Sequence, residues 1–213
     1  MLSVVVQGML VGMALAVPIG PNNIEIIWRG LRGGFIHGWL VGLGALTADT
    51  IYCAVVVTGV APFARSPRFQ APLFFVGAAV LLYLGTMGLR EAIRGAGMVV
   101  EAGSKGRSYG TGFVMAVSNP LGIIYWLSIG SALIADAIRR SGDGAGPAVI
   151  FGVFFGIFCW VTLLSGLTQF GKRWVTPRVF RVISGIGGAM LIGFGIFFLV
   201  QGVQAMFELR AGG

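Results

Sequence analysis

The chain has 213 residues, of which 56% are apolar and only 10% are charged, and its formal net charge is +8. Because a soluble domain carries roughly a quarter charged residues, this composition, with a mean hydropathy of +0.91, excludes an ordinary soluble protein. The basic residues lie at the ends of apolar runs and form no basic face interleaved with aromatic residues. We therefore expect a lipid bilayer as the partner of this chain, and no nucleic acid.

Six apolar segments are long enough to cross a hydrocarbon core of about 30 Å, which takes roughly 20 helical residues. Each span must be helical, because lipid offers no partner to an unpaired backbone group. The sequence thus predicts an all-α polytopic membrane protein, with one transmembrane domain over residues 1–213. The spans are expected near residues 2–28, 35–60, 72–94, 109–134, 146–168 and 181–206.

The N-terminus resembles a signal peptide, since Ala14, Leu15 and Ala16 have the pattern of a cleavage site. No Lys or Arg precedes the apolar run, however, so we expect a retained first span. Lys and Arg number ten in the first, third and fifth connections, against five in the second and fourth connections and the C-terminus. By the positive-inside rule this predicts that both termini lie outside the cell.

Glycines recur at intervals of four, which favours close helix packing; one row runs from Gly30 to Gly42 and another contains Gly152 and Gly156. Six spans also divide into two halves of three, near residues 1–100 and 108–213. An odd-numbered unit that is duplicated within one chain must have inverted topology. The residues leave open whether the halves are a true inverted repeat.

Two clusters of proline and asparagine interrupt the first and fourth spans. Proline removes a helical hydrogen bond, so both helices should open there, and open backbone at membrane depth is tolerated only against protein or a wet cavity. Broken helices at related places in two halves are typical of transporter binding sites. The helix that restarts near Asn22 would direct its positive end into the gap, which suits a carboxylate. Predicted substrate-binding residues are Pro18, Gly20, Pro21, Asn22, Asn23, Asn119, Pro120, Tyr125 and Trp126.

Asp49 is the one acidic residue expected deep within a span, about 21 Å from its start at 1.5 Å per residue. A charge at that depth costs several kcal/mol and marks a functional site by default. We therefore predict that Asp49 is the proton-coupling residue. Further neutral candidates for the cavity are Thr47, Thr50, Tyr52, Trp160 and Thr162.

The segment PIGPNN at residues 18–23, the glycine row and Asp49 together resemble the first-half signature of the lysine-exporter (LysE/RhtB-type) family. NPLGIIYWLSI at residues 119–129 resembles the second Asn-Pro motif of that family. The resemblance implies a bacterial inner-membrane exporter of amino acids or close derivatives, driven by an ion gradient, that is not an enzyme and needs no cofactor. Ile19 between Pro18 and Gly20, and Ala48 before Asp49, depart from the family pattern.

Other functions are weighed against proton-coupled export. A thiol–disulfide relay would use Cys53 and Cys159, but both lie away from the helix breaks. A heavy-metal exporter would prefer a cluster of thiolates or carboxylates, and no metal site is expected here. An ATP-driven pump is disfavoured because no phosphate-binding loop is present. The sequence leaves open which amino acid is carried and whether the chain forms a homodimer.

Overall fold

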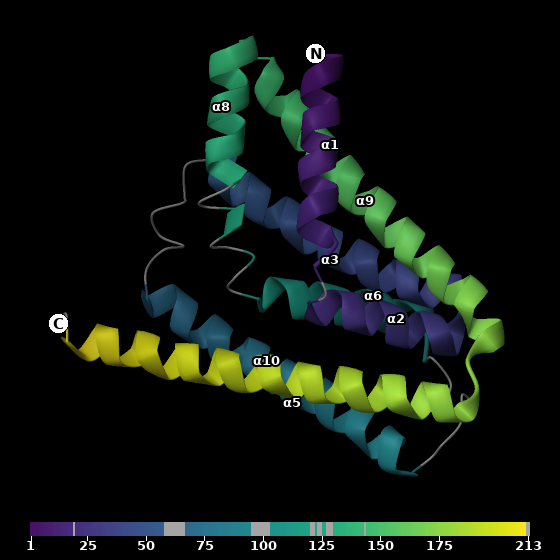
Figure 1. Ribbon diagram of the computed structural model, residues 1–213. Helices are drawn as coiled ribbons and strands as arrows, with labels where there is room; N and C mark the ends of the chain where they lie inside the picture. The colour runs from purple at the N-terminus through teal and green to yellow at the C-terminus, as the bar shows by residue number, and fades with distance from the viewer. Residues whose placement is uncertain are drawn as a thin grey trace.

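The computed structural model describes residues 1–18, 20–57, 67–94, 103–119, 122, 125–126, 130–142 and 144–211, and all regular structure in these ranges is helical (Figure 1). This confirms the predicted all-α fold. A 3₁₀ turn at Lys172–Trp174 joins the last two helices. The helices are α1 (Leu2–Ala16), α2 (Pro21–Gly33), α3 (Phe35–Val57), α5 (Pro67–Arg94), α6 (Lys105–Val117), α8 (Ser131–Ser141), α9 (Ala145–Gly171) and α10 (Pro177–Ala211).

Four helices in the described ranges are long and apolar enough to cross a membrane, namely α3, α5, α9 and α10. Counted as one bent unit, α1 and α2 make a fifth span. In the fourth expected span, near residues 109–134, the structure describes α6, the start of α8 and a few residues between them. Neither helix is long enough to cross alone.

The predicted break in the first span is confirmed. α1 ends at Ala16, α2 begins at Pro21, and the two axes differ by 78°. Proline suits the first position of a helix, because the N–H that it lacks would have no partner there. Gly20 precedes it in an extended conformation and gives no side-chain cap. The chain therefore opens its backbone between the two helices and starts again in a new direction.

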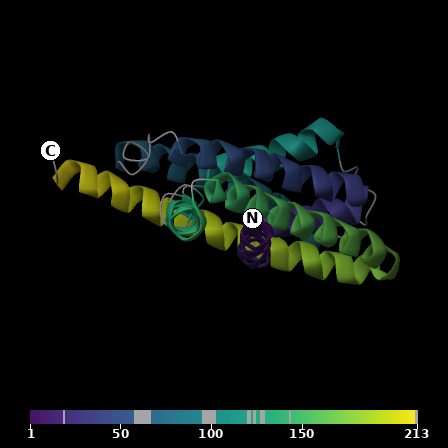
Figure 2. The same ribbon diagram turned by 90° about the horizontal axis from the view of Figure 1, so that it is seen from above.

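The helices pack in three close pairs, α1 with α9, α3 with α6 and α5 with α10. Figure 2 views α1 and α8 almost along their axes, while the four long helices run across the picture. Small residues at the crossings bring the backbones together, as predicted for the row that contains Gly152 and Gly156. A Cβ atom added to any of the following would overlap the backbone of the facing helix: Gly8, Gly12, Gly44, Gly85, Gly112, Gly152, Gly156 and Gly188.

The short helix α2 lies between the pairs and contacts α3, α6, α9 and α10. Its apolar side chains are almost fully buried, with Ile26, Trp28 and Leu31 at most 5% exposed. The Trp28 indole Nε1 donates a hydrogen bond to Ser184 Oγ on α10 at 3.1 Å. α2 is thus held by protein on all sides, and its first turn is placed at the centre of the molecule.

Candidate functional site

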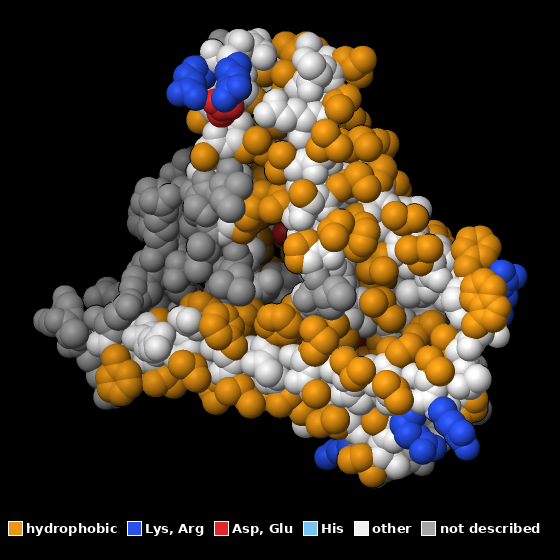
Figure 3. Space-filling view, viewed as in Figure 1, with side chains coloured by type: hydrophobic (Ala, Val, Ile, Leu, Met, Phe, Trp, Pro, Cys, Tyr) orange, Lys and Arg blue, Asp and Glu red, His pale blue; other side chains and the backbone are white. Residues whose placement is uncertain are grey.

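A cavity of about 290 Å³ lies at the break between α1 and α2. In the space-filling view the molecule is hollowed between its upper arm and its lower helices, and an acidic side chain is visible within the hollow (Figure 3). The lining comes from the end of α1, the start of α2, the middles of α3 and α9, and the segment after α6. The lining residues are Leu15, Ala16, Pro18, Gly20, Pro21, Asn22, Asn23, Ile26, Gly42, Ala45, Asp49, Asn119, Gly122, Tyr125, Trp126, Ile157, Trp160 and Val161.

Asn23 hydrogen-bonds to backbone carbonyl groups at the break between α1 and α2. Its Nδ2 donates to the carbonyl oxygens of Ala16 at 2.7 Å and Pro18 at 2.8 Å. Its Oδ1 accepts a hydrogen bond from Trp160 Nε1 at 3.3 Å. The amide is only 7% exposed. Asn23 lines the cavity as predicted, but both amide atoms are already engaged, and it holds the break open and in place.

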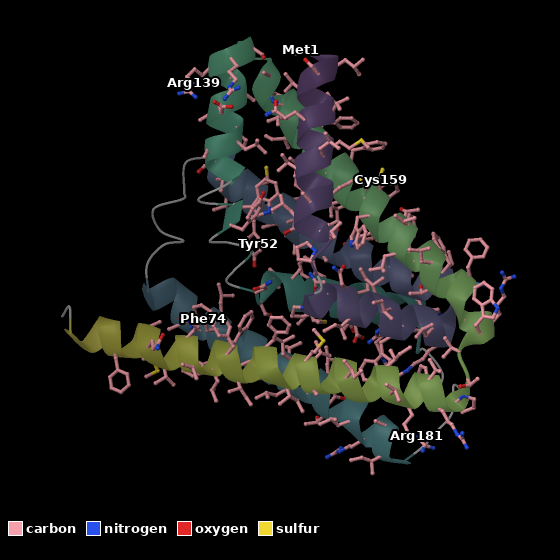
Figure 4. All side chains as sticks on the ribbon, in the orientation of Figure 1. Met1, Tyr52, Phe74, Arg139, Cys159 and Arg181 are labelled. Carbon is pink, nitrogen blue, oxygen red and sulfur yellow. The ribbon has the colours of Figure 1, made fainter. Side chains whose placement is uncertain are left out.

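A side chain from another helix also donates hydrogen bonds to the backbone carbonyls at the end of α6. The Tyr52 hydroxyl on α3 donates to the carbonyl oxygens of Ala116, at 3.2 Å, and Val117. Figure 4 shows Tyr52 directed toward the middle of the molecule. Asn119 follows this helix end and lines the cavity, whereas Pro120 lies outside the described residues. The ends of α1 and α6 are thus both capped by side chains from other helices.

Asp49 is the only charged side chain among the described residues that line the cavity. Trp126 Nε1 donates to its Oδ1 at 3.4 Å, which is long for a hydrogen bond. Trp126 is fixed by stacking on Phe154, with ring centroids 5.4 Å apart. The Asp49 carboxylate therefore faces the cavity and accepts one long hydrogen bond from a buried aromatic residue.

The first turn of α2 supplies the opposite polarity. Pro21, Asn22 and Asn23 line the cavity. The first backbone hydrogen bond of the helix runs from the Ile24 N–H to the Gly20 carbonyl at 3.1 Å, so the N–H groups of Asn22 and Asn23 precede it. A helix N-terminus carries a partial positive charge and donors suited to an anion. The cavity thus combines one carboxylate with one site that favours a carboxylate.

Glu25, which follows the break and lies near the end of the first expected span, is also buried, at 2% exposed. Its Oε1 forms a salt bridge with Arg29 Nε, while Oε2 has no partner within the described part of the chain. Arg29 also donates to Ser108 Oγ at 3.2 Å and Thr111 Oγ1 at 2.8 Å on α6. The spacing of four residues between Glu25 and Arg29 on a helix was the signal that could have revealed this pair.

Not all neutral candidates reach the cavity. Tyr125, Trp126 and Trp160 line it. Thr47 and Thr50 bond the backbone of α3, and Thr162 accepts from Trp39 Nε1 at 3.1 Å. The apolar lining residues, such as Ile26, were missed because nothing in a hydrophobic run distinguishes a cavity wall from a packed core.

The two cysteines are both free thiols, and neither lines the cavity. Cys53 is buried in a cluster with Tyr52 and Trp126, and Cys159 lies on α9 (Figure 4). No group of three metal-ligating side chains occurs within the described ranges.

Comparison with known proteins identifies the family. The model of the LysE type translocator matches residues 13–202. The chain belongs to the LysE-type translocator family. This is a family of transporters, not of enzymes, and its members are multi-pass membrane proteins.

Three similar proteins align with this chain along nearly their whole length. The chain is 29% identical to "Putative amino acid efflux protein YcgF" of Bacillus subtilis, over 92% of this chain and 95% of the relative. It is 32% identical to the chemotactic transduction protein ChpE of Pseudomonas aeruginosa, over 91% and 96%. It is 30% identical to the arginine exporter protein ArgO of Yersinia enterocolitica, over 90% and 93%. No solved structure matches the chain.

Proposed function

We propose that this protein exports amino acids or close derivatives across a bacterial inner membrane in exchange for protons. The observation that carries the proposal is the cavity at a broken span, with Asp49 on one wall and the first turn of α2 on another. A free amino acid has an ammonium group and a carboxylate, and these match the two walls. The names of two relatives, an amino acid efflux protein and an arginine exporter protein, support the same substrate class.

In the proposed cycle, Asp49 binds either the substrate ammonium or a proton. The substrate enters from the cytoplasm and pairs with the ionised carboxylate. On the outer side it leaves, Asp49 takes up a proton, and the protonated cavity turns inward and releases that proton. Because one group serves both ligands, outward substrate movement and inward proton movement are coupled without a second site. Asn22, with its side chain and its backbone N–H, would orient the substrate carboxylate.

Alternating access is proposed to arise from two inverted three-span halves. Two packing contacts support this. Gly12 of α1 lies against the Val153 carbonyl of α9, and Gly112 of α6 lies against the Val41 carbonyl of α3. Adding 100 to a residue number in α1 gives the matching position in α6, and adding 112 to one in α3 gives the matching position in α9. Gly12 then matches Gly112 and Val41 matches Val153, so the two contacts are equivalent. Such a matched pair of contacts is expected of a duplicated three-span unit.

Further contacts obey the same correspondence. Gly44 lies against Tyr109, and the two shifts convert this contact into that of Gly156 with Met9. In the third pair, Gly85 and Gly188 each lie against the carbonyl of the other. Each half would then contribute three spans, α1–α2, α3 and α5 from the first and α6–α8, α9 and α10 from the second. A rigid rocking of halves about the cavity is the usual consequence of such symmetry.

The same proposal places six spans in the bilayer and both termini outside, following the ten-to-five bias of basic residues. A reporter fused after Gly213 that is active only outside the cytoplasm would agree with this orientation. Activity only in the cytoplasm would contradict the orientation and leave the export function untouched.

Uphill export in membrane vesicles with an imposed proton gradient tests the function. Asp49→Asn retains the shape and hydrogen-bonding capacity of the side chain but cannot titrate, so uphill export should be abolished and residual exchange should become independent of pH. Asn22→Ala is the matched control, which should weaken substrate binding and keep the pH dependence. Full uphill export by Asp49→Asn would refute the assigned coupling role. Failure of the wild-type protein to move any amino acid would refute the function.

A further inference from the structure

We propose that the second half of α2 is the cytoplasmic gate of the cavity, and that a buried ion-pair clamp holds this gate shut. The clamp consists of Glu25 and Arg29 on α2 with the hydroxyl groups of Ser108 and Thr111 on α6. This inference rests on the proposed function, in which the substrate enters from the cytoplasm, and it names the element that must move to admit the substrate.

The second half of α2 lies between the cavity and one end of the molecule. Ile26 is the last residue of α2 that lines the cavity. From there α2 runs toward the turn between α9 and α10 (Figure 1), which is one of the connections rich in Lys and Arg that are expected in the cytoplasm. Ile26, Trp28 and Leu31 are at most 5% exposed, so packed side chains fill this stretch. A substrate arriving from the cytoplasmic end would therefore meet α2 before it reached the cavity.

The clamp joins the two proposed halves of the chain. Arg29 belongs to the first half, and its Nη1 and Nη2 donate to Ser108 Oγ at 3.2 Å and to Thr111 Oγ1 at 2.8 Å in the second half. Ser108 is fully buried, and its Oγ also lies 3.0 Å from His37 Nδ1 on α3. A rocking motion that separates α2 from α6 must therefore break the hydrogen bonds of Arg29.

Other contacts at this end of α2 also cross between the halves. Trp28 donates to Ser184 on α10, and Lys172 Nζ, just after α9, donates to the Arg32 carbonyl at 3.0 Å. Gly30 packs so closely on α9 that an added Cβ atom would overlap the hydroxyl of a facing threonine. The second half of α2 is thus held by α6, α9 and α10 at once, as expected of a gate in its closed position.

A buried ion pair suits a gate that must open again. Glu25 is 2% exposed and Arg29 is 12% exposed, and the free energy of taking both charges out of water offsets much of their attraction. Glu25 Oε2 has no hydrogen-bond partner within the described residues, which lowers the stability of the closed position further. Water that enters when α2 parts from α6 would solvate both charged groups. The clamp therefore sets the geometry of the closed gate without making its opening prohibitively costly.

The counterpart of this pair on α8 assigns a state to the structure. Adding 111 to the numbers of Glu25 and Arg29 gives Asp136 and Arg140, within one residue of the 112 that relates α3 to α9. α2 contains seven buried residues, whereas α8 contains none. Counterparts in an inverted repeat lie toward opposite sides of the membrane. In this structure α2 therefore shuts the cavity toward the cytoplasm, while α8 leaves it accessible from outside.

The first experiment labels a cysteine in the cavity from each side of the membrane. Ala45→Cys, in a chain that also carries Cys53→Ala and Cys159→Ala, places a single thiol on the cavity wall. A membrane-impermeant maleimide is added to inside-out and to right-side-out vesicles. We expect labelling to be at least about tenfold faster from the outer face than from the cytoplasmic face. The assay needs no substrate, so its result does not depend on the export function.

Two mild variants of this reporter chain should loosen the gate. Thr111→Val removes one acceptor of Arg29, and Arg29→Lys keeps the charge beside Glu25 but loses the fork that reaches two hydroxyls. Each should raise the rate of labelling from the cytoplasmic face by roughly five- to tenfold. Thr47→Val is the matched control, because it removes the hydrogen bond from the Tyr109 hydroxyl that joins α6 to α3 and does not involve α2.

Three results would overturn the inference. One is an unchanged cytoplasmic labelling rate in both clamp variants, with thermal midpoints within a few degrees of the reporter chain. Another is an equal rise in Thr47→Val, which would mean that any hydrogen bond between the halves controls access. The third is faster labelling of the reporter chain from the cytoplasmic face, which would contradict the closed side assigned to α2.

A disulfide can hold the gate shut without changing the clamp. A Cβ atom on Gly30 of α2 would lie 3.0 Å from the Cβ atom of Thr168 on α9, close to the spacing of about 3.5–4.5 Å in disulfides. Gly30→Cys with Thr168→Cys, together with Cys53→Ala and Cys159→Ala, should therefore form a bond between the halves on oxidation. In proteoliposomes we expect amino-acid counterflow to be lost in the oxidised protein and to return when the same sample is reduced.

The outcomes of this second experiment separate the gate from the export function. Counterflow that continues at the same rate in fully oxidised protein would overturn the gate and leave the export function standing. Absence of counterflow with every amino acid, in the reduced protein and in the wild type alike, would instead overturn the proposed function. The labelling rates would still decide whether α2 closes the cavity.

Discussion

The ends of α1 and α6 both lie at the cavity, and their backbone carbonyls find hydrogen-bond donors in two different ways. α1 ends at Ala16, and the freed carbonyl accepts a hydrogen bond from Asn23, a neighbour in sequence on the next helix. α6 ends at Val117, and the carbonyls there accept from Tyr52 on α3, far away in the chain. Open backbone near a membrane must find such partners. The first half therefore caps its break locally, and the second half depends on the first.

The short helices that follow these breaks differ more strongly. α2 and α8 each carry an acidic residue and an arginine four positions apart, and each is followed by a glycine with a positive φ, 81° and 85°. Arg29 of α2 is 12% exposed, whereas Arg140 of α8 is 69% exposed. Figure 1 shows α2 enclosed among other helices and α8 standing at the edge beside α1. We therefore expect the ion pair on α2 to contribute more to the free energy of unfolding than the ion pair on α8, because only the pair on α2 is buried.

The largest effect on stability should come from Arg29→Ala. The substitution leaves the buried Glu25 carboxylate without its cation and removes the hydrogen bonds from Arg29 to Ser108 and Thr111, so the free energy of unfolding should fall by about 3–5 kcal/mol. Unfolding of the purified protein in detergent measures this change. The matched variant Arg140→Ala on α8 should leave stability almost unchanged. Equal losses in the two variants would show that burial does not separate these pairs.

A smaller loss is expected at the helix crossings, and it should be equal in the two halves. Gly12→Ala and Gly112→Ala each force a methyl group against a facing carbonyl, so each should cost about 1–3 kcal/mol and lower the thermal midpoint. Gly110→Ala is the control on the same helix as Gly112, because a Cβ there meets nothing within 4 Å. It should stabilise α6 slightly through better helix propensity. A large loss in only one of the two crossing variants would count against the inverted repeat.

Much of the fold could be predicted because hydrocarbon imposes simple rules. Apolar length located the spans at α3, α5, α9 and α10, and prolines in an apolar run located the break before Pro21. The region of the fourth expected span was harder. Its hydropathy resembles a continuous span, but α6 ends at Val117, where the Tyr52 hydroxyl donates to the backbone carbonyls.

The polar residues that line the cavity were predicted from the sequence, and the apolar ones were missed. Asp49 and Asn22 were exceptional in their runs and do line the cavity. Ile157 resembles its neighbours, and only the tertiary structure shows that it faces the cavity. The separate roles of Asn22 and Asn23 could not be predicted either, because adjacent residues on one helix turn contact different groups. Asn23 bonds the opened backbone of α1.

The smallest effect is expected from Asp136→Asn on α8. Hydrogen bonds from Arg139 and Arg140 hold the pKa of Asp136 below its usual range. A lowered pKa in the folded state means that the pair stabilises the fold above the pKa of the unfolded state, and that this contribution is lost as the pH falls through the folded-state pKa. Solvent screens so exposed a pair, so the thermal midpoints of wild type and variant at pH 7 should agree within about 1 °C.

The same pair of proteins should give identical midpoints at a low pH below the folded-state pKa of Asp136, where the wild-type carboxyl is protonated and resembles the amide. Thermal unfolding in detergent at the two pH values measures both differences. A drop of several degrees at pH 7 that disappears at low pH would mean that the Asp136 pair is buried in the working protein. In the proposed inverted repeat, that result would mean that α8 packs inward as α2 does here, and the contrast between the two helices would then belong to one state of the transport cycle.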